Sequence, residues 1–241
     1  DKQTFSEKKR LSFAERARIL SKEIQIDTTI INSNRRISTI YWELGYYDLF
    51  RKINIENINL SEKNKDSVSL GRANYNLGVY FRERTFTIDS AYYYFHKAEK
   101  IYRGLNERFE IVHILLEIAA IQRDEKDFTG SEVTSVEAIS LLEGLEQTNN
   151  VRKFKSFFYN NLGLVFGEME QYEESVFYYK KAIKLLDNLP GDNTEAIEKS
   201  RNNLALSYKN SGNYKLALEI YNQILDNKSM ITERPGVYAV V

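Results

Sequence analysis

Histidine is the side chain most often used for proton transfer and metal binding near neutral pH. The 241-residue chain has two histidines, His96 and His113. Neither has a second histidine four positions away, so the spacing that places two zinc ligands on one helical face is missing. A Ser-His-Asp arrangement is not indicated around either residue. We therefore interpret both histidines as packing or surface residues.

Other groups that could perform chemistry are equally sparse. The chain has no cysteine, which excludes disulfides, thiolate zinc sites and cysteine nucleophiles. It contains neither a Gly-x-x-x-x-Gly-Lys-[Ser/Thr] phosphate loop nor a Gly-x-Gly-x-x-Gly turn. Carboxylates are numerous but scattered along faces expected to be solvated. The sequence thus predicts no catalytic site, no metal and no cofactor within these residues.

The charge balance limits the partners. Lys plus Arg and Asp plus Glu both number 34, so the formal net charge is zero, which argues against nucleic acid or an anionic membrane surface as a partner. The longest apolar stretch, residues 111–121, is shorter than the ~20 residues that span a bilayer, so we expect no membrane insertion of this region. Two prolines against 17 tyrosines and 13 phenylalanines favour long helices that pack through large side chains.

The elements that must position any binding residues are visible as a repeat. Its clearest copy combines large residues with small ones, in the order Tyr159, Leu162, Gly163, Phe166, Tyr172, Ser175, Tyr179 and Ala182. Similar patterns surround Gly78 and Ala205, and weaker copies surround Ser38 and Ala119. These five small residues are 40, 41, 44 and 42 positions apart. A small side chain at each position would let two antiparallel helices approach closely.

This pattern resembles the tetratricopeptide repeat (TPR), although the usual TPR period is about 34 residues. The resemblance implies an all-α, right-handed superhelical solenoid of antiparallel helix pairs, forming a single domain over residues 1–241. We expect a leading helix at 5–30 as an N-terminal cap, repeats at 31–66, 71–105, 112–146, 156–189 and 198–228, and the start of a truncated further repeat at 232–241. The uncapped end at 232–241 could support self-association.

In TPR proteins the first helix of each repeat lines an inner groove. Carried over to this chain, the groove positions and the asparagines beside them give a candidate binding set: Arg35, Trp42, Arg72, Tyr75, Asn76, Arg82, Arg123, Asn160, Asn161, Lys199, Asn202, Asn203 and Lys209. The set contains Lys and Arg but no Asp or Glu. Arginine holds carboxylates in bidentate fashion, and asparagine amides can pair with a peptide backbone.

The resemblance therefore implies a protein or peptide partner that is acidic or has a free C-terminal carboxylate. The groove is similar to the carboxylate clamp of chaperone-binding TPR domains, without their full residue set. In the alternative interpretation, nearby carboxylates neutralise the bases inside the fold, namely Glu43, Glu83, Asp124 and Glu168.

The long period, the Tyr-Asn-Asn-Leu-Gly phrase and the Asp-Ser-Ala-Tyr-Tyr-Tyr phrase resemble the TPR sensor regions of bacterial histidine kinases and helix-turn-helix regulators. This implies a non-catalytic sensory or interaction region of a larger signal-transduction protein, such as a two-component system, on the periplasmic side of a membrane-anchored parent. The alternatives are a free-standing scaffold or adaptor and a cytoplasmic peptide-pheromone receptor.

Overall fold

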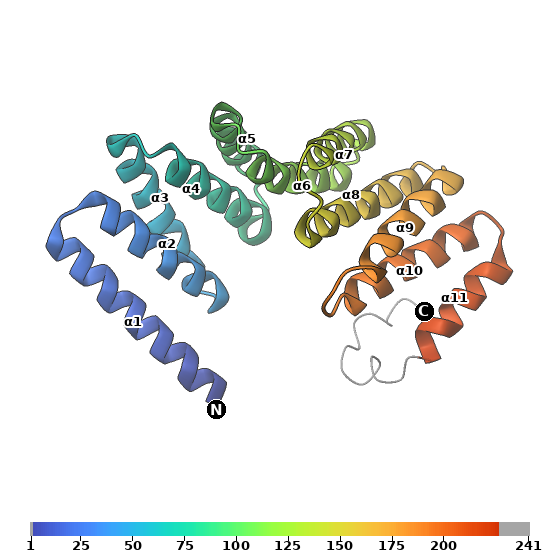
Figure 1. Ribbon diagram of the computed structural model, residues 1–241, viewed down its shortest axis with the longest axis horizontal. Coiled ribbons are helices and arrows are strands. Elements are labelled where there is room, and N and C mark those ends of the chain that lie inside the picture. The colour runs from blue at the N-terminus through green and yellow to red at the C-terminus, as the bar shows by residue number, and fades with distance from the viewer. Residues whose placement is uncertain (1, 227–241) are drawn as a thin grey trace. The chain divides into compact units, whose positions relative to one another are not determined.

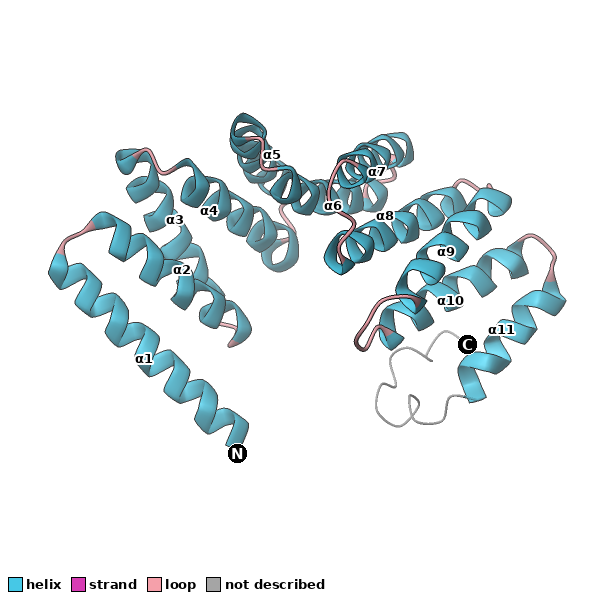
Figure 2. Ribbon diagram, viewed as in Figure 1, coloured by secondary structure: helices cyan, strands magenta, loops and turns pink. Residues whose placement is uncertain are grey.

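The computed structural model describes residues 2–226, and every regular element in that range is a helix (Figures 1 and 2). The predicted all-α fold of helix pairs is confirmed. The expected start of a further repeat at 232–241, with its proposed self-association, lies outside the described residues. No helix among residues 2–226 combines the length and apolar character needed to cross a membrane.

The chain divides into two compact units, residues 1–114 and 115–241, with the boundary inside one helix. Unit 1 contains α1 (Lys2–Ile24), α2 (Asp27–Glu43), α3 (Tyr47–Asn64), α4 (Ser67–Tyr80) with a π-helical turn at Phe81–Thr85, and α5 (Ile88–Leu105). The boundary lies in α6 (Arg108–Asp124). Unit 2 continues with α7 (Phe128–Glu143), α8 (Asn149–Glu168), α9 (Tyr172–Asp187), α10 (Thr194–Asn210) and α11 (Tyr214–Asp226).

The described helices are a leading helix, α1, and five pairs from α2–α3 to α10–α11. Each pair begins before the repeat boundary expected from the sequence, by four residues at α2, α4, α6 and α10 and by seven at α8. Gln25 adopts a left-handed backbone conformation with φ of 59°, and this ends the leading helix. Residues 27–30, which the sequence placed in the leading helix, therefore begin α2. That the pairs form one continuous domain over 1–241 stays a prediction.

The recurring small residues lie where paired helices cross. A Cβ atom added at Gly78 would lie 2.6 Å from Cδ1 of Phe95, and one at Gly163 would lie 2.7 Å from Cε1 of Tyr179. Each aromatic ring thus rests directly on the backbone of the first helix of its pair. Ala119 and Ala205 are fully buried at the equivalent positions. The period seen in the sequence therefore has a steric cause.

Hydroxyl groups reinforce two of these crossings. Ser131 Oγ donates to the carbonyl oxygen of Ala119, and Ser175 Oγ donates to that of Gly163, both at 2.7 Å. The α2–α3 pair is built differently, because a buried asparagine replaces the aromatic ring: Asn54 Nδ2 donates to Ser38 Oγ at 2.8 Å. This substitution explains why the first repeat matches the pattern least well.

Candidate functional site

Unit 1 contains a polar cavity of about 320 Å³, which we call the inner pocket. Its lining comes from the first helices of three repeats and from α5: Arg35, Thr39, Arg72, Tyr75, Asn76, Tyr102, Glu110, His113 and Ile114. Four members of the predicted binding set, Arg35, Arg72, Tyr75 and Asn76, therefore lie together. This volume is at the lower end of the range for small-ligand pockets.

One wall of the inner pocket depends on a glycine. A Cβ at Gly71 would lie 2.8 Å from Cζ of Tyr102, so the tyrosine ring packs directly on the α4 backbone. The hydroxyl of Tyr102 donates to the carbonyl oxygen of Val68 at 3.3 Å. Burial, reinforced by the charge of Glu110, raises the pKa of Tyr102 to about 12. The tyrosine is thus a neutral, fixed wall of the pocket.

Two guanidinium groups and one carboxylate set the charge of the inner pocket. Arg35 and Arg72 are both exposed. Arg72 Nη2 lies 3.9 Å from Glu110 Oε1, at the outer limit for an ion pair between partly exposed groups, and such a pair contributes little. Sequence reasoning missed Glu110, although its place one helical turn before His113 on α6 was a usable signal.

His113 is the titratable group inside the inner pocket. Its ring packs edge-on against Phe109, with the ring centroids 5.0 Å apart. Burial lowers the pKa of His113 below its ordinary value of 6.5; the charge of Arg72 acts in the same direction, whereas Glu110 opposes it. At pH 7 the imidazole is therefore neutral, able to donate one hydrogen bond and accept another.

Asn76 is held in place by residues that do not line the inner pocket. Its Nδ2 donates to Oδ1 of Asn54 at 2.8 Å, and Asn54 is held in turn by Ser38. The ring of Tyr75 lies beside that of Phe95, with centroids 5.8 Å apart. The two pocket residues from the middle of α4 are therefore positioned by buried partners rather than by solvent.

Trp42 and Arg82 belong to the predicted set but do not line the inner pocket. The ring of Trp42 packs against Phe50 and Tyr47, with centroids 4.8 and 5.3 Å apart. The guanidinium of Arg84 lies 5.0 Å from the Trp42 ring, which is a cation–π distance. Arg82 lies in the π-helical turn after α4. Trp42 is therefore part of a packed aromatic cluster.

In unit 2, Arg123 and Asn161 bind each other and their neighbours. Asn161 Nδ2 donates to Ser131 Oγ at 2.9 Å and to Ser135 Oγ at 3.0 Å, while its Oδ1 accepts from Arg123 Nη1 at 2.6 Å. Arg123 Nη2 also donates to Asp124 Oδ1 at 2.7 Å. The amide of Asn161 is thus used inside the fold, and its expected role toward a peptide backbone stays a prediction. For Arg123, the alternative of neutralisation by a nearby carboxylate describes the structure.

The remaining predicted residues of unit 2 lie on α8 and α10. Asn160 Oδ1 accepts from Ser200 Oγ at 3.1 Å, and Lys199 Nζ lies 2.9 Å from Glu195 Oε1. Lys209 is exposed and Asn203 is half-buried. Among residues 2–226, Asn202 Oδ1 is a buried oxygen without a hydrogen-bond partner.

The part of the chain that the structure describes contains no cluster of three or more His, Asp or Glu side chains placed to hold a metal ion. His96 lies on the surface of α5, where its Nδ1 is 3.0 Å from Glu99 Oε2 and its ring stacks on Tyr92. The chemistry available at the inner pocket is therefore hydrogen bonding and ion pairing.

Comparison with known proteins supports the repeat assignment. Residues 157–229 match the family model of the tetratricopeptide repeat. BtubC from P. vanneervenii is similar in structure, with a TM-score of 0.80, 16% identity, and coverage of 94% of this chain and 92% of that one. The apo form of the quorum sensor NprR from B. thuringiensis gives a TM-score of 0.73 and 11% identity, over 97% of this chain and 64% of NprR.

A third structure, with the nearly identical TPR-like repeats of a Podosopora anserina kinesin light chain, gives a TM-score of 0.65 and 12% identity, covering 85% of this chain and 97% of that one. No curated protein matches the chain in sequence. At these identities the structural likeness shows the fold. The predicted resemblance to tetratricopeptide repeats is confirmed.

Proposed function

We propose that this chain, which matches the TPR family model over residues 157–229 and has a TPR-like fold, is a non-catalytic module that binds a protein or peptide through the inner pocket of unit 1. The observation that carries the proposal is the pair of exposed guanidinium groups, Arg35 and Arg72, on a cavity with a neutral histidine and a fixed asparagine. Together these groups match a peptide segment that carries a carboxylate.

The charges favour one orientation of such a peptide. Among residues 9–225, Arg35 forms no ion pair, whereas Arg72 already has Glu110 at 3.9 Å. A carboxylate next to Arg35 would gain a charge-assisted hydrogen bond, whereas one next to Glu110 would be repelled. We therefore infer that the ligand carboxylate, either a C-terminus or an acidic side chain, binds on the Arg35 side.

The test compares matched peptides and matched variants by isothermal titration calorimetry. A library of peptides with a free C-terminal carboxylate, together with acidic internal sequences, would first identify a binder. Its amidated or glutamine-substituted twin should then bind at least about tenfold more weakly, since a hydrogen bond to a charged group contributes ~1.5–3 kcal/mol.

The double variant R35A/R72A should show the same loss, and the double variant K199A/K209A in unit 2 is its charge-matched control. Equal affinities for both peptide twins would contradict the carboxylate preference. An equal loss in the control would contradict the placement of the site in unit 1.

We further propose that the module is the sensory or interaction region of a larger bacterial signal-transduction protein, on the periplasmic side of a membrane-anchored parent. The long repeat period and the two aromatic phrases support this placement. The likeness to a quorum sensor favours a cytoplasmic peptide receptor as the second candidate. The flanking gene sequence separates them: an apolar stretch of about 20 residues followed by kinase or helix-turn-helix motifs selects the first, and their absence there selects the second.

A further inference from the structure

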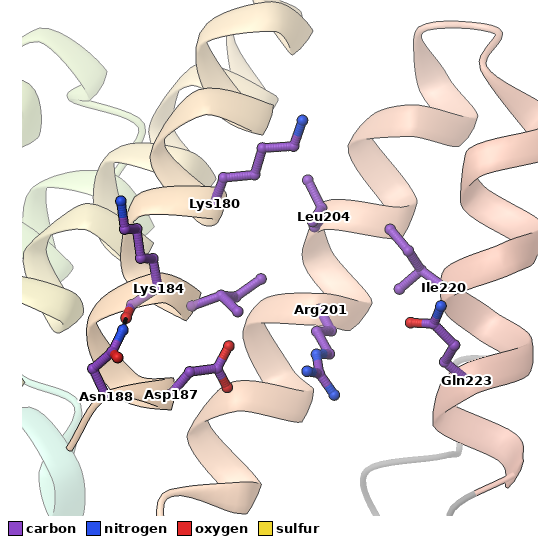
Figure 3. A pocket seen from close by; sticks show the side chains of 9 residues that line it. Lys180, Lys184, Asp187, Asn188, Arg201, Leu204, Ile220 and Gln223 are labelled. Atoms are coloured by element: carbon purple, nitrogen blue, oxygen red, sulfur yellow. Dashed lines mark hydrogen bonds between the residues drawn. The ribbon is translucent and has the colours of Figure 1, made fainter.

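A second cavity lies in unit 2 between α9, α10 and α11, with a volume of about 310 Å³ (Figure 3). We call it the outer cavity. Its apolar lining comes from one residue of each helix, Ile183, Leu204 and Ile220. None of these residues belongs to the predicted binding set, and the outer cavity shares no residue with the inner pocket.

Cations dominate the polar lining of the outer cavity. Lys180 and Lys184 extend from successive turns of α9, and both are exposed (Figure 3). Neither lysine forms an ion pair among residues 9–225, and Lys180 Nζ lies 5.5 Å from the centroid of the Tyr208 ring, a cation–π distance. Arg201 is held by Glu198, with Nη1 and Oε1 2.9 Å apart. Asp187 is the one carboxylate in the lining, so the lysine charges are not balanced locally.

In the equivalent groove of unit 1, between α1, α2 and α3, a carboxylate lies next to the cationic side chains. Arg18 donates to Asn34 Oδ1 at 2.8 Å and to Glu56 Oε2 at 2.6 Å. Lys22 Nζ lies 2.7 Å from Glu56 Oε1. The carboxylate of Glu56 thus neutralises the cations that α1 contributes to this groove.

Aligning the repeats on their small residues places Gln223 at the position of Glu56. Both lie 18 residues after the small residue, since 223 − 205 and 56 − 38 are equal. Unit 2 therefore has a neutral amide where unit 1 has the neutralising carboxylate. This exchange leaves the outer cavity apolar inside and cationic at its rim.

We propose that the outer cavity binds a small organic anion with an apolar body, specifically a medium-chain aliphatic carboxylate. The aliphatic chain lies on Ile183, Leu204 and Ile220, and the carboxylate lies at the rim of the outer cavity, facing Lys180 and Lys184. Charge complementarity selects the anion, and the apolar lining selects a ligand that buries methylene groups. The site is separate from the proposed peptide site and does not depend on it.

Titration of the full chain with hexanoate, octanoate and decanoate, followed by calorimetry and by the methyl NMR signals of the three apolar residues, tests this proposal. Each added methylene buried in the cavity should tighten the Kd by about fourfold. Octylamine, with the same chain and the opposite charge, should bind at least about tenfold more weakly than octanoate. Octylamine binding as tightly as octanoate, or no binding of decanoate at millimolar concentration, would overturn the proposal.

A matched pair of variants locates the site. Q223E places a carboxylate in the lining, at the repeat position of Glu56, and should weaken octanoate binding at least about tenfold, because the added charge repels the carboxylate of the ligand. N222D makes the same amide-to-carboxylate change on the neighbouring exposed residue and should change the Kd less than about twofold.

The double variant K180Q/K184Q removes the rim charge at exposed positions without adding a carboxylate, and it should also lose at least about tenfold in affinity. Equal effects of Q223E and N222D, or unchanged binding in K180Q/K184Q, would show that octanoate binds elsewhere.

Discussion

Unit 1 and unit 2 place similar side chains at the same repeat positions but use them differently. In unit 1 the arginines Arg35 and Arg72 are exposed around an open pocket. In unit 2 the base at the repeat position of Arg72 is Lys199, since both lie six residues before the small residue, and Lys199 is paired with Glu195 at 2.9 Å. Arg123, at a different repeat position, is bound to Asn161 and Asp124. The repeat position alone therefore does not decide whether a base is available to a ligand; the partners within its reach decide it.

The asparagines show where the partners come from. Asn76 and Asn161 occupy the same repeat position, and each donates to the second helix of the preceding repeat, at Asn54 and Ser135 respectively. Asn54 and Ser135 are themselves equivalent, since 54 − 38 and 135 − 119 are both 16. In the other repeats this position is aromatic. A polar residue at the position of Asn54 and Ser135, together with an asparagine at the position of Asn76 and Asn161 in the next repeat, thus indicates a hydrogen bond between the two repeats.

The largest expected effect is on the free energy of unfolding, and it tests a feature that both units share: a glycine where two paired helices cross. G78A in unit 1 and G163A in unit 2 should each lower the free energy of unfolding by about 3 kcal/mol, because the new methyl group overlaps an aromatic ring. G104A is the control, because a Cβ there meets nothing within 4 Å. It should leave stability unchanged or raise it by up to about 1 kcal/mol. Urea unfolding of the three variants measures this; similar losses in all three would refute the steric account.

The next largest effect is also on stability, and it tests whether Asn161 forms more buried hydrogen bonds than Asn76. N161A removes hydrogen bonds to two serines and to Arg123 and should cost about 2 kcal/mol, whereas N76A removes the hydrogen bond to Asn54 at a less buried site and should cost about 1 kcal/mol. Amide hydrogen exchange in each unit would resolve the two losses. An equal cost for both variants would remove the distinction drawn between the units.

A smaller effect concerns the charge balance around Glu56. Burial by itself raises the pKa of Glu56, but hydrogen bonds from Lys22 and Arg18 outweigh burial and lower the pKa below its ordinary value of 4.5. A carboxyl with a lowered pKa stabilises the fold above its ordinary value, and this stability is lost as the pH falls through the lowered pKa. E56Q should therefore cost about 1 kcal/mol at pH 7 and less at pH 3. Denaturant unfolding at both pH values measures it; a cost that does not shrink at pH 3 would exclude this ion-pair network as the cause.

The smallest effect concerns His113. Because its pKa is lowered in the folded chain, the unfolded chain binds the proton more tightly, and stability falls as the pH drops below 6.5 toward the folded pKa. H113Q should reduce this pH dependence without altering stability above pH 7. Titration of the imidazole NMR signals should give a midpoint below 6.5 for His113, and a midpoint above that value would contradict the burial described here.

Much of the fold follows from the spacing of residues in the sequence. The spacing of Gly78, Ala119, Gly163 and Ala205 identified the helix pairs because the close approach of two helices demands a missing or small side chain at a fixed place in each pair. The least readable repeat was the first, where Asn54 replaces the aromatic ring and the crossing is polar. The site was only partly readable: Arg35, Arg72, Tyr75 and Asn76 do share a pocket, but Glu110 and Tyr102 complete it from positions outside the pattern.

The sequence by itself determined the helix pairs, their order and the side of each first helix that carries the polar groups. These properties follow from contacts between residues close together in the chain. Only the tertiary structure decided which of those polar groups remain open to a ligand, because their partners come from other repeats. Asn161 is bound by Ser135, 26 residues earlier, while the side chain of Arg35 has no such partner among residues 9–225. Whether a carboxylate or a hydroxyl from another helix reaches a given base is fixed by packing.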